Sequence, residues 1–177
     1  MPKQTVQTNV HGRRFGLSKT NELIFNDANT VQQDAILIPK HHVMIELTAA
    51  QMQTGFSVPI TIVAAPGAGF ALLVSEVRVS KAAGTAFAGI AAGEDLIVVH
   101  TAGTDPLVTT IETTGFLDST SDEMRIGRAV DVSGTYDLTA LANTGIDYEL
   151  LVGDITGGSP VVFDVYYERI DLTALAA

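Results

Sequence analysis

The sequence contains no cysteine and no tryptophan, and only 6% of its 177 residues are aromatic. The absence of cysteine excludes disulfide frameworks, thiolate metal sites and a cysteine nucleophile. No apolar run approaches the ~18 residues that a membrane-spanning helix needs, and the first 20 residues lack the apolar core of a secretory signal peptide. We therefore expect a soluble protein with no membrane partner and no export signal.

The chain is long enough for one folded domain with at most an appendage. Hydrophobic residues make up 46% of the sequence and charged residues 17%. This composition indicates a chain with a buried core and excludes a disordered one.

Charge is distributed unevenly along the chain. The formal net charge is −10, yet residues 1–20 hold Lys3, Arg13, Arg14 and Lys19 and no acidic residue. A basic N-terminal segment therefore precedes an acidic body. A solvated tail and a segment held by another protein surface both fit this composition.

Residues 21–40 contain two short apolar groups, the first at 23–25 and the second ending at Pro39, separated by polar spacers. Each group is too short for a stable helix but suits an extended segment that lies against another surface. Proline ends the second group because it donates no backbone hydrogen bond. We predict an extended N-terminal arm over residues 1–40 and a folded domain over residues 41–177.

The body is dominated by short segments of β-branched and aliphatic residues bounded by Gly and Pro turns. Pro59 within one of them indicates an edge strand or a bulge. The helix signals are a single turn after the N-cap residue Thr48 and a short helix within 116–130, capped by Ser119 or Ser121. The expected strands are 43–47, 57–63, 71–80, 96–100, 107–112, 146–152 and 161–170.

These six or seven short strands, without a long helical pattern, are typical of an antiparallel fold. We expect 57–63 and 71–80 to form a hairpin across the turn at 66–69. Residues 81–93, rich in Ala and Gly, are expected to form a long loop. The predicted fold class is all-β, an antiparallel β-sandwich or jelly-roll-like fold with an extended N-terminal arm.

One short phrase recurs in the sequence. Asp-Leu-Thr-Ala-Leu-Ala occurs at 137–142 and again at 171–176, and 45–50 is a looser copy. The irregular intervals exclude a solenoid. We interpret the phrase as a corner element, in which a strand end is followed by a Thr N-cap and one helical turn.

Residues suited to catalysis or metal binding are sparse. The four histidines form no chelating motif, and His41 and His42, as neighbours on a strand, would point to opposite faces. The acidic pairs match no EF-hand loop, and Asp147 and Glu149 are interpreted as a solvated strand face. Phosphate-loop and GxSxG motifs are absent. We expect no enzymatic activity, no metal and no cofactor.

Nucleic acid and sugar are weak candidates as ligands. The four basic residues of the N-terminal segment give only modest affinity for phosphate, and the acidic body opposes its approach. Sugar-binding sites normally use stacking aromatic rings, of which the chain has few. An acidic protein groove suits the basic segment better, and we expect no nucleic-acid partner.

The segments Ile45–Met52 (IELTAAQM) and Ser57–Phe70 (SVPITIVAAPGAGF) resemble small structural proteins of tailed-bacteriophage virions. In those proteins a strand ending in LTAAQ precedes a strand with the pattern P-[IV]-x-[IV]-[IV]-x-A-P-G-A-G and a third aliphatic strand. The likeness covers about residues 43–130. It implies a capsid decoration (cement) or auxiliary head protein, or the base of a head fibre, with a β-sandwich that clusters around a capsid symmetry axis. The basic arm departs from a minimal member of that class.

The partners implied by this resemblance are the major capsid protein and further copies of the chain, as a homotrimer or homodimer. The implied location is the outer surface of a phage head, in a virion whose proteins are made in the host cytoplasm. We expect the arm to contact a neighbouring subunit by adding backbone hydrogen bonds along a sheet edge. Its expected contact residues are Arg13, Arg14, Phe15, Leu23, Ile24 and Phe25.

Two other functions remain open from the sequence. A receptor- or glycan-binding domain of a head or tail fibre would bind host polysaccharide in a manner that depends on Tyr166 or Tyr167. A small jelly-roll shell protein would assemble into shells unaided.

Overall fold

The chain forms two compact units, Met1–Leu37 and Ile38–Ala177, and each is described by itself. In this computed structural model the described residues are 7–8, 14–17, 23–26, 40–130 and 138–173.

The described residues of the first unit form three short strands. These are β1 (Gln7–Thr8), β2 (Arg14–Leu17) and β3 (Leu23–Asn26). They pair antiparallel in the order β1-β2-β3, so β3 lies at an edge of this small sheet. The apolar group at 23–25 is therefore part of a strand, as its composition predicts.

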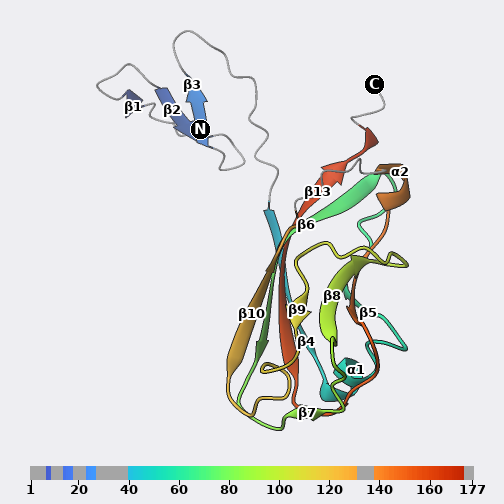
Figure 1. The fold of residues 1–177 in the computed structure, drawn as a ribbon. Coiled ribbons are helices and arrows are strands. Elements are labelled where there is room, and N and C mark those ends of the chain that lie inside the picture. Colours follow the sequence, from blue (N-terminus) through green and yellow to red (C-terminus); the bar gives the residue numbers. More distant parts are fainter. Residues whose placement is uncertain (1–6, 9–13, 18–22, 27–39, 131–137, 174–177) are drawn as a thin grey trace. The chain divides into compact units, whose positions relative to one another are not determined.

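Among the described residues of the second unit, eight strands form two four-stranded antiparallel sheets (Figure 1). In chain order they are β4 (Lys40–Leu47), β5 (Ile60–Val63), β6 (Phe70–Lys81), β8 (Asp95–His100), β9 (Ile111–Glu112), β10 (Glu123–Arg128), β11 (Ile146–Leu150) and β13 (Val161–Asp171). Sheet I has the order β10-β6-β13-β4, and sheet II has the order β5-β11-β8-β9. The all-β sandwich predicted from the sequence is confirmed.

The strands pair from the two ends of this unit inward. β4 pairs with β13, β5 with β11, β6 with β10 and β8 with β9. Further pairing of β13 with β6, and of β11 with β8, completes each sheet. Nested pairing of first with last in two four-stranded sheets is the topology of a jelly roll.

Short elements lie in the loops that join the sheets. They are α1 (Ala49–Gln53), α2 (Leu138–Leu141) and the paired strands β7 (Phe87–Ala88) and β12 (Thr156–Gly157). The segment expected to be a long loop thus contains β7. None of the described helices is long and apolar enough to cross a membrane.

The core lies between the two sheets. Tyr148 of β11 and Phe163 of β13 are fully buried, with ring centroids 5.2 Å apart. The Tyr148 hydroxyl donates to the Met52 carbonyl (3.0 Å), and burial raises the pKa of this hydroxyl. The aliphatic part of the core includes Leu47, Val77, Val79, Leu96, Val98, Ile146, Val161 and Val165.

The predicted hairpin between 57–63 and 71–80 is wrong. β5 lies at an edge of sheet II, as Pro59 predicts, whereas β6 lies inside sheet I. The turn between them carries the chain from one sheet to the other, so the two strands are not neighbours. Their hydrogen-bond partners are distant in sequence.

The predicted helix within 116–130 is also wrong, because residues 123–128 form β10. Exposure alternates along this strand, with Met124, Ile126 and Arg128 facing outward. This period of two is the pattern of a strand at the surface of a sheet. In this segment the period-two pattern therefore outweighs the helix N-cap signal of Ser119 and Ser121.

The predicted strand 107–112 is regular only at β9. Val108 forms an isolated bridge with Ala129, and the Thr109 N–H donates to the Arg128 carbonyl (2.8 Å). The segment therefore pairs first beside β10 and then with β8, and no single partner extends it into a long strand.

The predicted corner element, a strand end followed by a Thr N-cap and one helical turn, is confirmed at 45–50, which is the first copy in chain order. Thr48 caps α1: its Oγ1 accepts from the Gln51 N–H (3.3 Å), and the Gln51 side chain accepts from the Thr48 N–H (2.9 Å). In the second copy α2 already begins at Leu138, and in the third the Asp171 carboxylate accepts from the Thr173 N–H (2.9 Å). The predicted Thr N-cap is therefore wrong for the second copy, and the helical turn predicted after Thr173 lies outside the described residues.

Candidate protein-interaction surfaces

Two loops at one end of the sandwich expose large apolar side chains. One loop joins α1 to β5 and the other follows β11. They lie side by side, because the Leu150 N–H donates to the Gly55 carbonyl (3.2 Å). We call the four exposed side chains the apolar loop patch: Phe56 (51% exposed), Val58 (53%), Leu151 (46%) and Val152 (45%).

A buried carboxylate fixes one of these loops. Glu94 is only 1% exposed, and its carboxylate accepts from the Val152 N–H (3.0 Å) and the Gly153 N–H (2.8 Å). The Thr113 hydroxyl donates to the Glu94 carbonyl. These two hydrogen bonds satisfy adjacent backbone N–H groups of the loop from a single buried side chain. The loop backbone is therefore held in one conformation while its apolar side chains remain exposed.

A second carboxylate links the two loops. Asp154 accepts from the Phe56 N–H (3.2 Å) and the Ser57 N–H (2.9 Å). Hydrogen bonding from the side chain and backbone of Ser57, and then from the backbone of Phe56, lowers the pKa of Asp154. The apolar loop patch is thus presented by a preorganised backbone, which reduces the entropy lost when a partner binds.

The second candidate surface is the outer face of sheet I. The strand registers place its outward side chains in a grid of three rows. Across β10, β6, β13 and β4 the first row is Met124, Ser80, Val162 and Glu46, the second is Ile126, Arg78, Asp164 and Met44, and the third is Arg128, Glu76, Tyr166 and His42.

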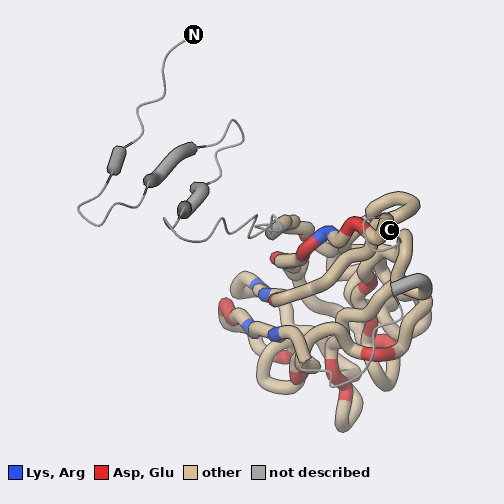
Figure 2. The backbone as a smooth tube through the Cα atoms, turned by 90° about the horizontal axis from the view of Figure 1, so that it is seen from above, with Lys and Arg blue, Asp and Glu red and all other residues tan. Residues whose placement is uncertain are grey.

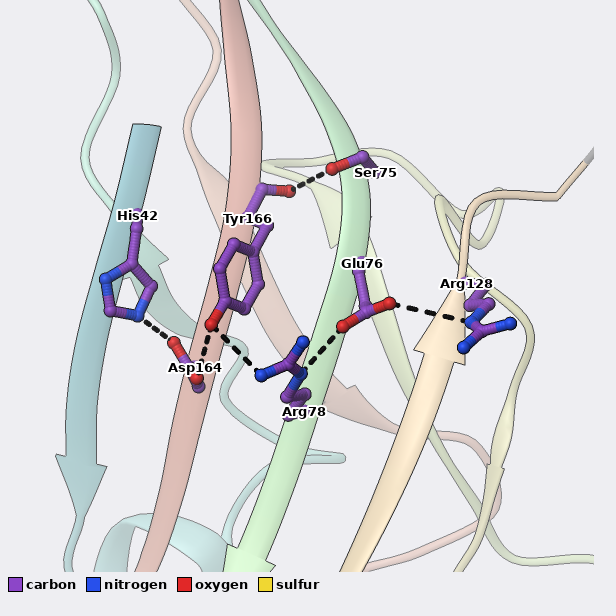
Figure 3. A network of polar contacts seen from close by, with 7 residues as sticks. All are labelled: His42, Ser75, Glu76, Arg78, Arg128, Asp164 and Tyr166. Atoms are coloured by element: carbon purple, nitrogen blue, oxygen red, sulfur yellow. Dashed lines mark hydrogen bonds and ion pairs between the residues drawn. The ribbon is translucent and has the colours of Figure 1, made fainter. Parts of the chain in front are cut away.

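A polar network crosses this face (Figure 3). The Arg78 Nε donates to Glu76 (2.7 Å), and its Nη1 donates to the Tyr166 hydroxyl (3.2 Å). That hydroxyl donates to Asp164 (3.1 Å), which also contacts His42 Nε2. The hydrogen bond with Glu76 raises the pKa of Arg78. Burial, followed by the hydrogen bond to Asp164, raises the pKa of Tyr166.

Large apolar side chains border this network at both edges of the sheet. Met44 on β4 is 64% exposed, and Met124 and Ile126 on β10 are 57% and 43% exposed. The outer face of sheet I therefore combines an ordered polar centre with apolar margins. Typical protein interfaces have the opposite arrangement, an apolar core within a polar rim, so it is the exposure of these large apolar side chains that marks this face as a candidate.

The two tyrosines considered for glycan binding lie on opposite faces of sheet I. Tyr166 is on the outer face, where His42 stacks on its ring at 4.7 Å and the Arg78 guanidinium lies 4.7 Å from the ring centroid. Tyr167 packs against the core and stacks on His41 at 5.4 Å. His42 and Arg78 thus lie against the ring of Tyr166, which disfavours the stacking of a sugar on that ring.

Potential metal ligands do not gather into a group of three or more within the part of the chain that the structure describes. His41 and His42 face opposite sides of β4, which confirms that prediction.

The interpretation of Asp147 as solvated is wrong. It is 3% exposed and accepts from the Thr101 hydroxyl (3.0 Å). Burial lowers the pKa of His100.

A cavity of about 220 Å³ lies beside Ser75, where the register between β6 and β13 shifts by one residue. Its walls are mostly apolar, with one carboxylate, and are formed by Leu73, Val74, Ser75, Leu107, Ala129 and Glu168. No cluster of convergent polar groups accompanies it within the described residues, so its geometry favours no particular ligand.

The arm residues proposed from the sequence lie in the first unit. Arg13 is outside the described residues, Arg14 and Phe15 are in β2, and Leu23, Ile24 and Phe25 are in β3. The register of β2 with β3 places Phe15 opposite Phe25. Their contact with a neighbouring subunit stays a prediction.

Neither surface was predicted from the sequence pattern. Val58, Leu151 and Val152 were expected inside strands, whereas β5 begins at Ile60 and β11 ends at Leu150. A signal for the sheet face was present, since Met124 and Ile126 alternate with polar residues at a period of two. No comparable signal in the sequence identifies Glu94 as a loop anchor.

Comparisons with known proteins identify no family. No protein-family model matches the chain, and no curated protein matches it. A chain from a solved structure described as the native virion of Kashmir bee virus at acidic pH is similar at 12% identity and a TM-score of 0.26. The match covers 94% of this chain and 92% of that one, but its low TM-score carries no argument about function.

Proposed function

We propose that this protein is a structural component of a virus particle, a decoration (cement) protein that binds the outer surface of the head. Its partner would be the major capsid protein, and its role would be to bridge neighbouring capsid subunits without catalysing a reaction. The observation that carries this proposal is the apolar loop patch, because a rigid, solvent-exposed apolar surface is costly to a protein without a partner.

The energetics of the patch suit such a contact. Complete burial of a large apolar side chain contributes about 1.5–3 kcal/mol, so covering four half-exposed ones would contribute on the order of 4 kcal/mol. That is weak for a single site. Many copies on one particle, each with a second contact through the arm, would bind with much higher avidity.

Two further features support the proposal. The jelly roll is a fold of viral capsid proteins, although it also occurs in lectins and cupins and does not by itself define a function. The phrases at Ile45–Met52 and Ser57–Phe70 resemble those of phage virion proteins. The arm would supply the second contact through Arg14 and Phe15 on β2 and through residues 23–25 on β3.

The test is co-sedimentation of the purified chain with heads that lack it, from the phage that encodes it. We expect saturable binding and greater resistance of the loaded heads to heat. The double variant F56E/L151E should weaken binding at least tenfold, because it places two charges in an apolar contact. Thr104→Glu, which adds a charge to an exposed loop between β8 and β9, is the matched control.

Absence of binding by the wild-type chain would contradict the proposal, and so would equal binding by F56E/L151E and wild type. Assembly of the purified chain into closed shells would instead support a shell protein. Saturable binding to host polysaccharide that is lost on changing Tyr166 would support a fibre domain.

Truncation tests the role of the arm separately. Deleting residues 2–25 should abolish binding to heads while the remaining chain still unfolds cooperatively in urea. A truncated chain that still saturates heads would show that the loop patch alone is sufficient.

A further inference from the structure

We infer that the outer face of sheet I is a self-association surface, on which two copies of this chain pack face to face around a twofold axis parallel to the strands. The occupant of the face would be a second copy of the same face. This inference is independent of head binding, because it concerns the purified chain alone.

Large apolar side chains are exposed on the outer face of sheet I. Met44, Met124 and Ile126 are exposed on the outer face, at 64%, 57% and 43%, on the two edge strands β4 and β10. The same sheet buries its other face in the core. Sheets pack face to face when both present apolar side chains, with their strands nearly aligned.

The charged side chains of this face are also distributed unevenly. Basic positions of the body gather mainly on one side, whereas acidic positions are spread around it (Figure 2). On the outer face, the half formed by β10 and β6 carries Arg128, Arg78 and one acid, Glu76. The half formed by β13 and β4 carries two acids, Asp164 and Glu46. The face therefore has a basic half and an acidic half.

Such a face is complementary to itself in one orientation. A twofold axis parallel to the strands places β10 over β4 of the second copy and β6 over β13. It therefore sets the basic half of each copy against the acidic half of the other. In the middle row of the grid, Ile126 meets Met44 and Arg78 meets Asp164. In this row the apolar side chains cover each other around two pairs of opposite charges, whereas in the first row Met124 meets Glu46.

The other twofold arrangement is unfavourable. An axis perpendicular to the strands, in the plane of the interface, places each strand over its own copy. The middle row then sets Arg78 against Arg78 and Asp164 against Asp164, and like charges in an interface are repulsive. Because each chain carries a net charge of −10, local attraction must offset a general repulsion. The arrangement that pairs opposite halves is the one that can do so.

The size of the face predicts a weak dimer. Four strands span about 19 Å, and a six-residue strand such as β10 is about 20 Å long. The flat area of the face is therefore roughly 400 Å² per copy, without the additional surface of protruding side chains. Stable complexes bury about 800 Å² per partner. We therefore expect dimers at about 100 µM protein and monomers at low micromolar concentration.

Sedimentation equilibrium of the full chain is the first measurement. The mass should rise with concentration from 18.6 kDa toward twice that value. Ile126→Glu should weaken the dimer at least tenfold, because it sets a charge against Met44. Val58→Glu, which adds the same charge to the apolar loop patch, should leave dimerisation unchanged. A chain that stays monomeric at all concentrations would overturn the inference.

Cysteine cross-linking tests the symmetry, since the native sequence has no cysteine. With a bismaleimide that reaches about 10 Å, the spacing of face-to-face sheets, the double variant M44C/I126C should form a cross-linked dimer, and neither single variant should do so. Within one copy these positions lie on opposite edges of the sheet, about 14 Å apart and beyond that reach. The cross-links can therefore form only between copies.

Other cross-linking patterns would overturn the proposed arrangement. Dimers of the single variants would indicate the perpendicular axis, and a ladder of larger species from the double variant would indicate open-ended assembly. All these measurements use purified protein without heads. F56E/L151E should dimerise normally yet bind heads at least tenfold more weakly, so the two proposals fail independently.

Discussion

The two sheets of the sandwich differ in the solvent exposure of the side chains on their outer faces. On sheet I, outward side chains such as Met44 and Ile126 are exposed. On sheet II the outward positions of β8 are closed to solvent, with Ile97 7% and Val99 0% exposed, although neither belongs to the central core cluster. Asp147, opposite Val99 on β11, is 3% exposed. Among the described residues, the outward centre of sheet II at β8 and β11 is therefore closed to solvent although edge positions such as Glu112 are exposed, whereas sheet I exposes large apolar side chains on its outer face.

The largest expected effect comes from placing a charge on each outer face in turn. Val99→Asp should destabilise the fold by about 3–5 kcal/mol, because it buries a carboxylate beside Asp147. The matched change on the exposed face, Ile126→Asp, should alter stability by no more than about 0.5 kcal/mol. Urea unfolding at low micromolar concentration, where the chain is monomeric, gives both free energies.

If Val99→Asp prevents folding altogether, Val99→Thr and Ile126→Thr provide a milder pair. The first should cost about 1–2 kcal/mol and the second much less. Equal costs at the two positions would mean that sheet II is as open as sheet I and would remove the contrast.

A smaller effect is expected at Glu94, which directly precedes β8. Glu94→Ala leaves the N–H groups of Val152 and Gly153 without their acceptor and should cost about 2 kcal/mol. Hydrogen exchange of these two amides should accelerate more than exchange in the core. Glu112→Ala, at an exposed position of the same sheet, should leave both measurements unchanged. Unaltered exchange in Glu94→Ala would contradict the anchoring role.

The smallest effect is a pH dependence on the outward side of sheet II. Burial, followed by the charge of Asp147, raises the pKa of Glu149 above its ordinary value of 4.5. The folded state therefore holds this proton more tightly than the unfolded state, and stability falls as pH rises from 4.5 through the folded pKa. Glu149→Gln should raise Tm at pH 7 by up to about 3 °C, and the gain should vanish toward pH 4.

Glu46→Gln on the exposed face removes the same charge and serves as the control for Glu149→Gln. Its Tm should match that of wild type at both pH values. A gain that is the same at pH 4 and pH 7 would show that Glu149 acts through packing and not through its proton.

The local hydrophobic pattern predicted strands correctly where the burial of each face of the strand is the same along its length. The run at 96–99 is continuously apolar because β8 is buried on both sides, and the alternation at 161–170 corresponds to β13 in the middle of sheet I. The hairpin prediction failed because it assumed that neighbours in sequence are neighbours in a sheet. In a jelly roll the partners of β5 and β6 lie far along the chain, and periodicity carries no information about partners.

The candidate surfaces were less predictable than the fold. Phe56 and Leu151 are exposed because the backbone on either side leaves the sheets, and that depends on Glu94 and Asp154 bonding across the loops. Hydrophobicity alone assigns such residues to a core. The arm residues Arg13 to Phe25 were singled out from charge and apolar grouping, and their role stays a prediction.

The nested pairing of strands has a consequence for the order in which the molecule can form. β13, the last strand of the body, lies between β4 and β6 and pairs with both. During synthesis sheet I therefore cannot close until the ribosome has released residues beyond 160, and β4 and β6 wait with unpaired edges. Contacts between such distant segments fold slowly and leave the nascent chain open to aggregation. A chain that stalled before β13 would lack the strand that joins the two halves of sheet I.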